Sequence, residues 1–156
     1  MSIRQEALDL GTIDPAVLKR AEAVVERLRW VYIREWAPEV LSEMEAAVLG
    51  INQYAKRGPV MEGKRRDALL RLCHDMQGQA GTFGLELLAD FATSMHKIGE
   101  ASPVIRDRQA DVLVAHIMAM RTALRAVAAD PDGALSEGLH KELRRDLRKL
   151  RQKPFN

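Results

Sequence analysis

Apolar residues recur at intervals of three and four along almost the whole chain, a spacing typical of α-helices with one buried face. The alternation of Val, Ile and Thr that indicates strands is nearly absent, whereas Ala, Leu, Glu, Arg and Met are abundant. Aromatic residues make up only 4% of the 156 residues. The sequence therefore predicts an all-α fold.

Breaks in this pattern separate six predicted helices. The first begins at Asp14-Pro15, an N-cap carboxylate followed by proline at the first helical position. We expect residues 1–13 to be a flexible lead-in. The predicted helices span about 15–36, 38 to the Gly58-Pro59 break, 63–81, 85–98, 104–129 and 135–151.

Short connections between consecutive helices favour an antiparallel four-helix bundle, which we place at about 38–129. The N-terminal helix, about 15–36, is expected to pack on the bundle or to extend its first helix, because Pro38 can begin a helix or kink a continuous one. The C-terminal helix, about 135–151, is expected to cap the bundle. Residues 14–156 then form a single helical domain.

Several side chains carry structural expectations of their own. Trp30 and Trp36 are expected to anchor the N-terminal helix, or to mark a dimer surface if exposed. His116 lies on the edge of an apolar stripe and is expected at the boundary of the bundle. Gly84 is expected to begin a helix. Cys73, the one cysteine, lies on an apolar face and is expected to fill the core without a disulfide.

Composition limits the possible partners. A net charge of +2 does not indicate a nucleic-acid partner, and the basic C-terminal helix is interrupted by Glu142 and Asp146 and lacks interleaved aromatic residues. We see no apolar run of 18 residues and no signal-peptide core at the N-terminus. We therefore expect a cytoplasmic protein without a membrane or nucleic-acid partner.

The predicted helix at 63–81 carries a histidine away from its apolar face. At 100° per residue, His74 lies about 140° from Leu69, and Gly78 and Gly81 lie at about 180° and 120°. Each mid-helix glycine costs about 1 kcal/mol relative to alanine. Two glycines beside an exposed imidazole indicate a place where another molecule fits closely, although Gly78 could instead allow close helix packing. The core-facing residues of this helix are Leu69, Leu72, Cys73, Met76 and Ala80.

An exposed histidine beside helix surface left open by glycines suits phosphoryl exchange with another protein. A neutral imidazole nitrogen is nucleophilic near neutral pH, because the group ordinarily titrates near pH 6.5. In-line attack also needs an open approach to the ring. Gln77 lies three residues after His74, so its amide can donate a hydrogen bond to a phosphoryl oxygen on the same side. The alternative for His74 is a surface histidine without a role.

The run from His74 to Gly84, followed by Leu87 and Leu88, resembles the signature of histidine phosphotransfer (HPt) domains of bacterial two-component phosphorelays. Gln77 departs from that signature, since the family usually has a lysine there. Glutamine keeps a donor but loses the positive charge. The helical pattern extends the resemblance over about 38–129. The matching positions are Met76, Gly78, Ala80, Phe83 and Gly84.

This resemblance implies that His74 accepts a phosphoryl group from an aspartyl phosphate on a receiver domain and passes it to another receiver. The receivers would belong to response regulators or hybrid histidine kinases. In this reading Nε2 of His74 attacks, Gln77 holds the phosphoryl oxygens, and Gly78 and Gly81 admit the receiver. We expect no cofactor or metal of this chain's own, since Mg²⁺ would come with the receiver.

Leu70 and Asp67 lie on the His74 side of the helix and are candidate docking contacts, although Leu70 could be an incidental exposed leucine. Asp67 lies about 10 Å from His74 along the helix, too far to orient the imidazole. No phosphate-binding loop of the G-x-x-x-x-G-K-[ST] kind is present. We therefore expect a monomeric phosphoryl carrier without kinase activity. His96, His116 and His140 form no recognisable metal motif.

Two alternatives remain open because of Gln77. The chain could bind receivers without transferring phosphate, as a helical interaction module. It could also act as a receiver phosphatase or inhibitor in which Gln77 orients a water molecule.

Overall fold

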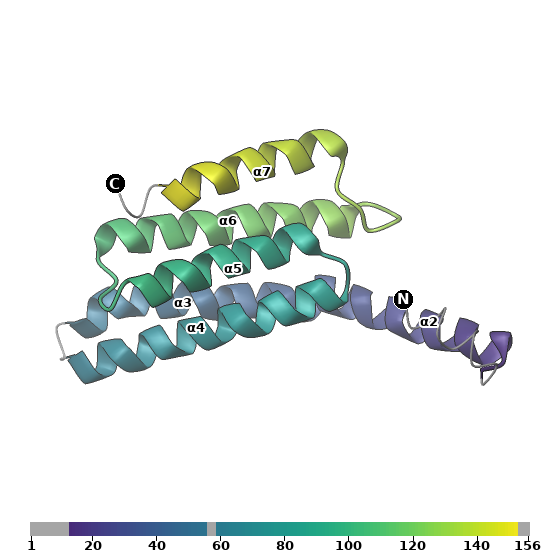
Figure 1. The fold of residues 1–156 in the computed structure, drawn as a ribbon, viewed down its shortest axis with the longest axis horizontal. Helices are drawn as coiled ribbons and strands as arrows, with labels where there is room; N and C mark the ends of the chain where they lie inside the picture. The colour runs from purple at the N-terminus through teal and green to yellow at the C-terminus, as the bar shows by residue number, and fades with distance from the viewer. Residues whose placement is uncertain (1–12, 56–58, 153–156) are drawn as a thin grey trace.

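The computed structural model describes residues 13–55 and 59–152, with only the backbone for residues 51–55 and 59–62, and it confirms the all-α prediction (Figure 1). The lead-in predicted at 1–13 lies, except for its last residue, outside the described residues. The elements are α2 (Pro15–Val31), a π-helical turn η1 (Tyr32–Trp36), α3 (Ala37–Ala55), α4 (Pro59–Thr82), α5 (Glu86–Ala101), α6 (Asp107–Ala129) and α7 (Glu137–Gln152).

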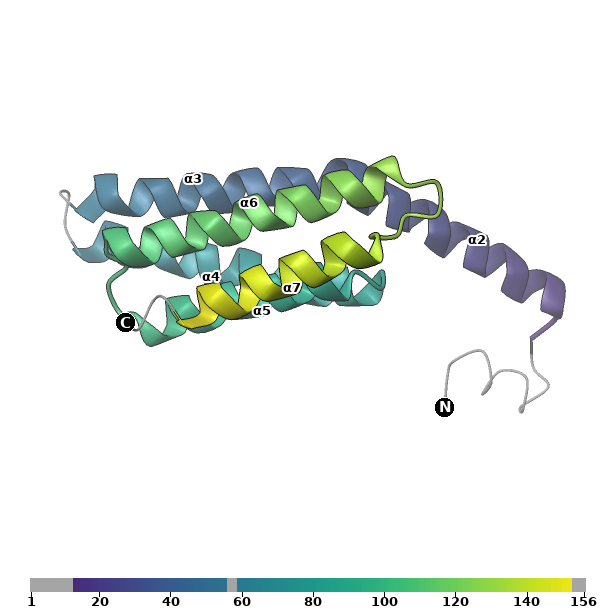
Figure 2. The same ribbon diagram turned by 90° about the horizontal axis from the view of Figure 1, so that it is seen from above.

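Helices α3 to α6 form the predicted antiparallel four-helix bundle (Figures 1 and 2). Contacts run from α3 to α4, α4 to α5, α5 to α6 and α6 back to α3, so the four helices close a ring around one core. Helix α7 lies lengthwise against α5 and α6 and covers a side of the bundle. Leu143, Leu147 and Leu150 are its buried residues, and their spacing explains why it packs by one face.

The core is built from the apolar positions that the helical period indicates. On α4, Leu69, Cys73, Met76 and Ala80 are fully buried and Leu72 is partly buried against the core, which confirms the predicted core face and the role of Cys73. Burial of a large apolar side chain stabilises the fold by about 1.5–3 kcal/mol. These contacts hold α4 along one side and leave its opposite face to solvent. Large fully buried side chains of the other elements are Tyr32, Ile33, Leu41, Met44, Phe91, Met95, Leu113, Ile117 and Met120.

Helix α2 extends the first helix of the bundle, one of the two arrangements expected around Pro38. Pro38 lacks an N–H group and its ring would clash with a carbonyl four residues earlier in a regular α-helix. The π-helical turn η1 ends just before it, and the Ala37 N–H bonds to the Tyr32 carbonyl five residues back. The chain therefore passes Pro38 without ending the helix.

Beyond η1, α2 projects from the bundle and has no buried residue (Figures 1 and 2). Trp30 is half-buried against the core and so anchors the base of α2, whereas Trp36 is 45% exposed and does not. The anchoring prediction is confirmed for the first tryptophan and wrong for the second. The large exposed apolar residues of α2 are Val17, Val24, Val25 and Leu28.

Gly84 ends α4, so the expectation that it begins the next helix is wrong. Its φ of +72° is in the left-handed region that glycine adopts without strain. The Leu85 N–H bonds to the Ala80 carbonyl at 2.8 Å, and the Gly84 N–H bonds to the Gly81 carbonyl at 3.1 Å. This pair of bonds is a Schellman motif, which satisfies two carbonyls at the C-terminus of α4.

His116 is fully buried, so the prediction of a boundary position is wrong. Its Nδ1 lies 2.7 Å from the Val112 carbonyl, and its Nε2 lies 2.8 Å from Oγ of Ser94 on α5. A neutral imidazole fits both contacts, because Nδ1–H donates to the carbonyl and Nε2 accepts from the Ser94 hydroxyl. Burial lowers the pKa of His116 from 6.5 to about 4.

We expect this buried histidine to make the fold weaken with acid. Between pH 6.5 and about 4 the unfolded chain binds a proton at His116 that the folded chain does not, so stability falls as the pH falls through this range. The loss approaches about 3 kcal/mol by pH 4. Urea unfolding from pH 4 to 7 checks this. The stability difference between wild type and His116→Gln should shrink by that amount towards pH 4, and a constant difference would contradict it. His140→Gln, at an exposed histidine, is the control.

Within the described ranges, α6 alone has the length and apolar composition of a membrane-spanning helix. Because α6 contains Arg121 and Arg125, it is not an uninterrupted apolar run, and the expectation drawn from such runs did not identify it. In the fold α6 contacts α3, α5 and α7, and nine of its residues are buried. Its apolar composition is therefore accounted for by its position in the core.

Candidate functional site

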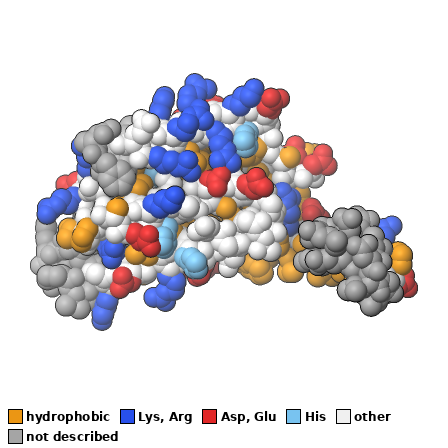
Figure 3. All heavy atoms as spheres, in the orientation of Figure 1, with side chains coloured by type: hydrophobic (Ala, Val, Ile, Leu, Met, Phe, Trp, Pro, Cys, Tyr) orange, Lys and Arg blue, Asp and Glu red, His pale blue; other side chains and the backbone are white. Residues whose placement is uncertain are grey.

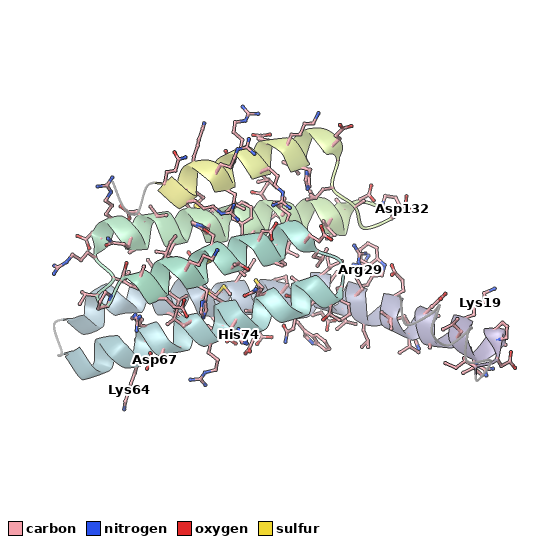
Figure 4. The ribbon with its side chains drawn as sticks, in the orientation of Figure 1. Lys19, Arg29, Lys64, Asp67, His74 and Asp132 are labelled. Carbon is pink, nitrogen blue, oxygen red and sulfur yellow. The ribbon has the colours of Figure 1, made fainter. Side chains whose placement is uncertain are left out.

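His74 lies on the exposed side of α4, opposite the buried face of that helix (Figure 4). The described residues make no hydrogen bond to its ring, although the ring of His96 lies beside it. Its neighbours Cys73 and Met76 are fully buried, so the backbone that carries His74 is held by the core. The imidazole is thus presented to solvent from a rigid support.

Gly78 and Gly81 leave bare helix surface one and two turns after His74. Both are exposed, and a Cβ atom added at either position would meet nothing within 4 Å. Close helix packing therefore does not explain Gly78. Gly99 on α5 is the contrasting case, since a Cβ there would lie 2.6 Å from Cδ2 of Leu70. The fold uses Gly99 for packing and has no such use for Gly78 or Gly81.

Gln77 lies one turn after His74 and is exposed. Among the described residues its side-chain amide has no hydrogen-bond partner. The amide is therefore available to a group bound on the ring of His74, as its spacing on the helix predicts. Its role in holding a phosphoryl group stays a prediction.

Leu70 and Asp67 occupy different environments on α4. Leu70 is half-buried, and its side chain lies over Gly99, so packing between α4 and α5 accounts for it without a partner. Asp67 is exposed on α4 (Figure 4). Its carboxylate lies 3.9 Å from the guanidinium of Arg66. The docking role of both residues stays a prediction.

His96 is the residue that sequence reasoning missed. It lies on α5, and its ring centroid is 6.2 Å from that of His74 with the planes inclined by 50°. Histidine side chains are exposed on the face where α4 and α5 meet (Figure 3). Nδ1 of His96 lies 3.5 Å from Oε1 of Glu100, one turn further along α5. The two histidines are 22 residues apart and on different helices, so no spacing within one helix indicates this pair.

Arg66 fixes α5 against α4 near this site. Its Nε donates to the carbonyls of Gly99 at 2.9 Å and Ser102 at 3.1 Å, and its Nη2 donates to the Glu100 carbonyl at 3.3 Å. These carbonyls belong to the C-terminal end of α5, where they lack intrahelical partners. Arg66, which is on the same helix as His74, therefore holds the turn of α5 that carries Glu100.

The site offers nucleophilic chemistry. An exposed imidazole with bare helix surface beside it can accept an electrophilic group from a large partner. No three His, Cys, Asp or Glu side chains gather in a metal-binding arrangement in the part of the chain that the structure describes. No carboxylate bonds to His74 within that part either.

Comparison with models of known families identifies the family of this chain. A model of the Hpt domain matches residues 30–153, which is wider than the 38–129 range of the sequence resemblance and takes in α7. No curated protein and no solved structure matches the chain. Domains of this family are phosphoryl carriers of phosphorelays and interact with receiver domains. With most of its length matched, the chain belongs to the Hpt domain family.

Proposed function

We propose that this protein carries a phosphoryl group on His74 between receiver domains. It accepts the group from an aspartyl phosphate on one receiver and passes it to the aspartate of another. The observation that carries the proposal is the pair of glycines beside an exposed histidine. Gly78 and Gly81 weaken α4 by about 1 kcal/mol each, and no neighbour in the fold requires them.

The chemistry needs no redox change and no bound nucleotide. The unprotonated Nε2 of His74 attacks phosphorus in line with the aspartyl oxygen. The N–P bond forms as the P–O bond breaks, and the electron pair leaves with the aspartate as a free carboxylate. The proton of the neutral imidazole stays on Nδ1. Transfer to the next receiver reverses these steps.

The remaining side chains of the site would contact the phosphoryl group and the receiver. Gln77 would donate hydrogen bonds to the phosphoryl oxygens. Leu70 and Asp67 would contact the receiver that docks on the bare helix surface beside His74. The Mg²⁺ that neutralises phosphoryl charge would belong to the receiver. In this role the chain is a monomeric cytoplasmic carrier without kinase activity of its own.

The test is phosphoryl transfer from radiolabelled phospho-receivers, tried as a panel from one bacterial source. We expect label on this protein that is lost in acid and kept in base, as a phosphohistidine behaves. The rate for each receiver ranks the partners. Failure of every receiver to transfer label would contradict the proposal.

The two alternatives give different results in the same assay. A receiver that binds without transferring label would indicate an interaction module. Label that leaves the receiver without appearing here would indicate a phosphatase, and Gln77→Ala should then abolish the effect because the glutamine would orient the attacking water. Neither result is expected, since neither alternative uses the nucleophilic ring of His74 that α4 exposes beside this bare helix surface.

A further inference from the structure

The site around His74 contains a second ionisable ring and lacks a fixed charge where the family usually has one. A phosphoryl group on His74 brings negative charge to the surface of α4, and Gln77 offers only a neutral amide. His96 lies beside His74 on α5, with its side chain 25% exposed. We propose that His96 in its imidazolium form, held by Glu100, supplies the positive charge beside phospho-His74. This inference rests on the proposed carrier function.

The position of His96 is set by packing on both sides of it. Met95 and Ile98 are buried in the core, and Gly99 receives the side chain of Leu70 from α4. Arg66 holds the last carbonyls of α5. The ring of His96 is thus presented towards His74 by a helix turn that α4 itself fixes. Such pre-set placement is what electrostatic stabilisation of a transferred group requires.

Glu100 and a phosphoryl group on His74 would both place negative charge beside the ring of His96. On α5, Oε1 of Glu100 lies 3.5 Å from Nδ1 of His96. On α4, the guanidinium of Arg66 is occupied by the carbonyls at the end of α5. Arg71 is exposed one turn before His74, and its charge does not vary with pH.

The polar contacts between α5 and the other helices packed on it lie away from His96. On α6, His116 is buried beneath Ser94, about 160° around α5 from His96. On α7, Arg144 pairs with Asp90 of α5. Lys97 is exposed next to His96 on α5 itself. Among the described residues, His96 is therefore the ionisable side chain whose ring lies beside that of His74.

Protonated His96 acts on the phosphorylated form of His74. After transfer, the imidazolium of His96 pairs with the phosphoryl oxygens and slows hydrolysis of the phosphoryl group. By linkage, phosphorylation of His74 must then favour protonation of His96 to the same extent. At pH 6.5 the lifetime of phospho-His74 would then be longer than the neutral amide of Gln77 alone would give.

The experiment compares the lifetime of phospho-His74 in wild type and His96→Gln at pH 6.5 and pH 8.5. The protein is phosphorylated by a competent receiver or by phosphoramidate, in a His140→Gln background that removes an exposed histidine. Comparison at each pH cancels the acid lability of phosphohistidine itself. We expect about tenfold faster loss in His96→Gln at pH 6.5 and equal rates at pH 8.5. In an NMR titration, the midpoint for the ring resonances of His96 should lie at higher pH in the phosphorylated protein than in the unmodified protein.

Control variants separate this charge from a general effect. Lys97→Gln, which removes a lysine from the same turn, should leave the lifetimes unchanged. Gln77→Lys added to His96→Gln should restore the lifetime at pH 6.5, because it returns a positive charge to the site. Circular dichroism checks that each variant folds.

The outcomes distinguish this inference from the function on which it rests. If His74 is phosphorylated, yet the lifetimes agree at both pH values and the His96 titration does not move, the role of His96 is overturned and the carrier function stands. If neither donor phosphorylates His74, both are overturned.

Discussion

His74→Gln is expected to lose all phosphoryl acceptance from receivers, a drop of at least about 100-fold to background. The nucleophile is the imidazole nitrogen, and an amide nitrogen has no free electron pair to attack phosphorus. The fold should be unaffected, because the side chain of His74 is exposed and forms no hydrogen bond among the described residues. Rapid-quench labelling from a competent phospho-receiver measures the change.

His140→Gln is the matched control, since it makes the same substitution at an exposed histidine on α7. It should label like wild type. Equal labelling of both variants would mean that the phosphoryl group lies on another residue. A receiver that still binds His74→Gln with wild-type affinity would show that docking and chemistry are separable.

The helices and the core face of α4 could be predicted from the sequence, because the apolar period alone determines them. Leu69, Cys73, Met76 and Ala80 lie on one side of a 3.6-residue helix whatever that helix packs against. The position of His74 on the opposite side follows from the same geometry. The all-α bundle and the exposure of the candidate phosphoacceptor therefore follow from the spacing of apolar residues along the chain.

Features that depend on contacts between helices could not be predicted in this way. His116 lies on the edge of its own stripe, and its burial results from α5, which places Ser94 against its ring. The pairing of His96 with His74 depends on the axial register of α4 against α5, which Arg66 and the Leu70–Gly99 contact set. A single sequence contains no direct record of that register.

Helix α2 shows another limit of periodicity. Its apolar row predicted a helix, and the helix is present from Pro15 to Val31. The same row suggests a buried face, yet Val24 and Leu28 are more than 40% exposed. The reason is the π-helical turn η1, which continues the chain through Pro38 and carries α2 beyond the end of the bundle. Amphipathicity indicates that a face is suited to burial but does not say what buries it.

Gly78→Gln is expected to separate the needs of the fold from those of the partner. Glutamine at an open helical position should raise the free energy of unfolding by about 0.5–1 kcal/mol, because it relieves the entropic penalty of glycine. The same side chain would stand where the receiver must approach His74, so transfer from a phospho-receiver should fall by about 100-fold. Phosphorylation by phosphoramidate, a small donor, should change by less than about threefold.

Gly63→Gln is the control for the gain in stability, because Gly63 is also on α4 and a Cβ there meets nothing within 4 Å. It should stabilise the fold to a similar extent and leave receiver transfer unchanged. Equal loss of transfer in both variants would point to a general effect of stiffening α4. Loss with both donors in Gly78→Gln would mean that the glutamine covers the ring of His74 itself. Loss with the receiver alone would show that α4 forgoes stability at Gly78 to admit a protein-sized donor.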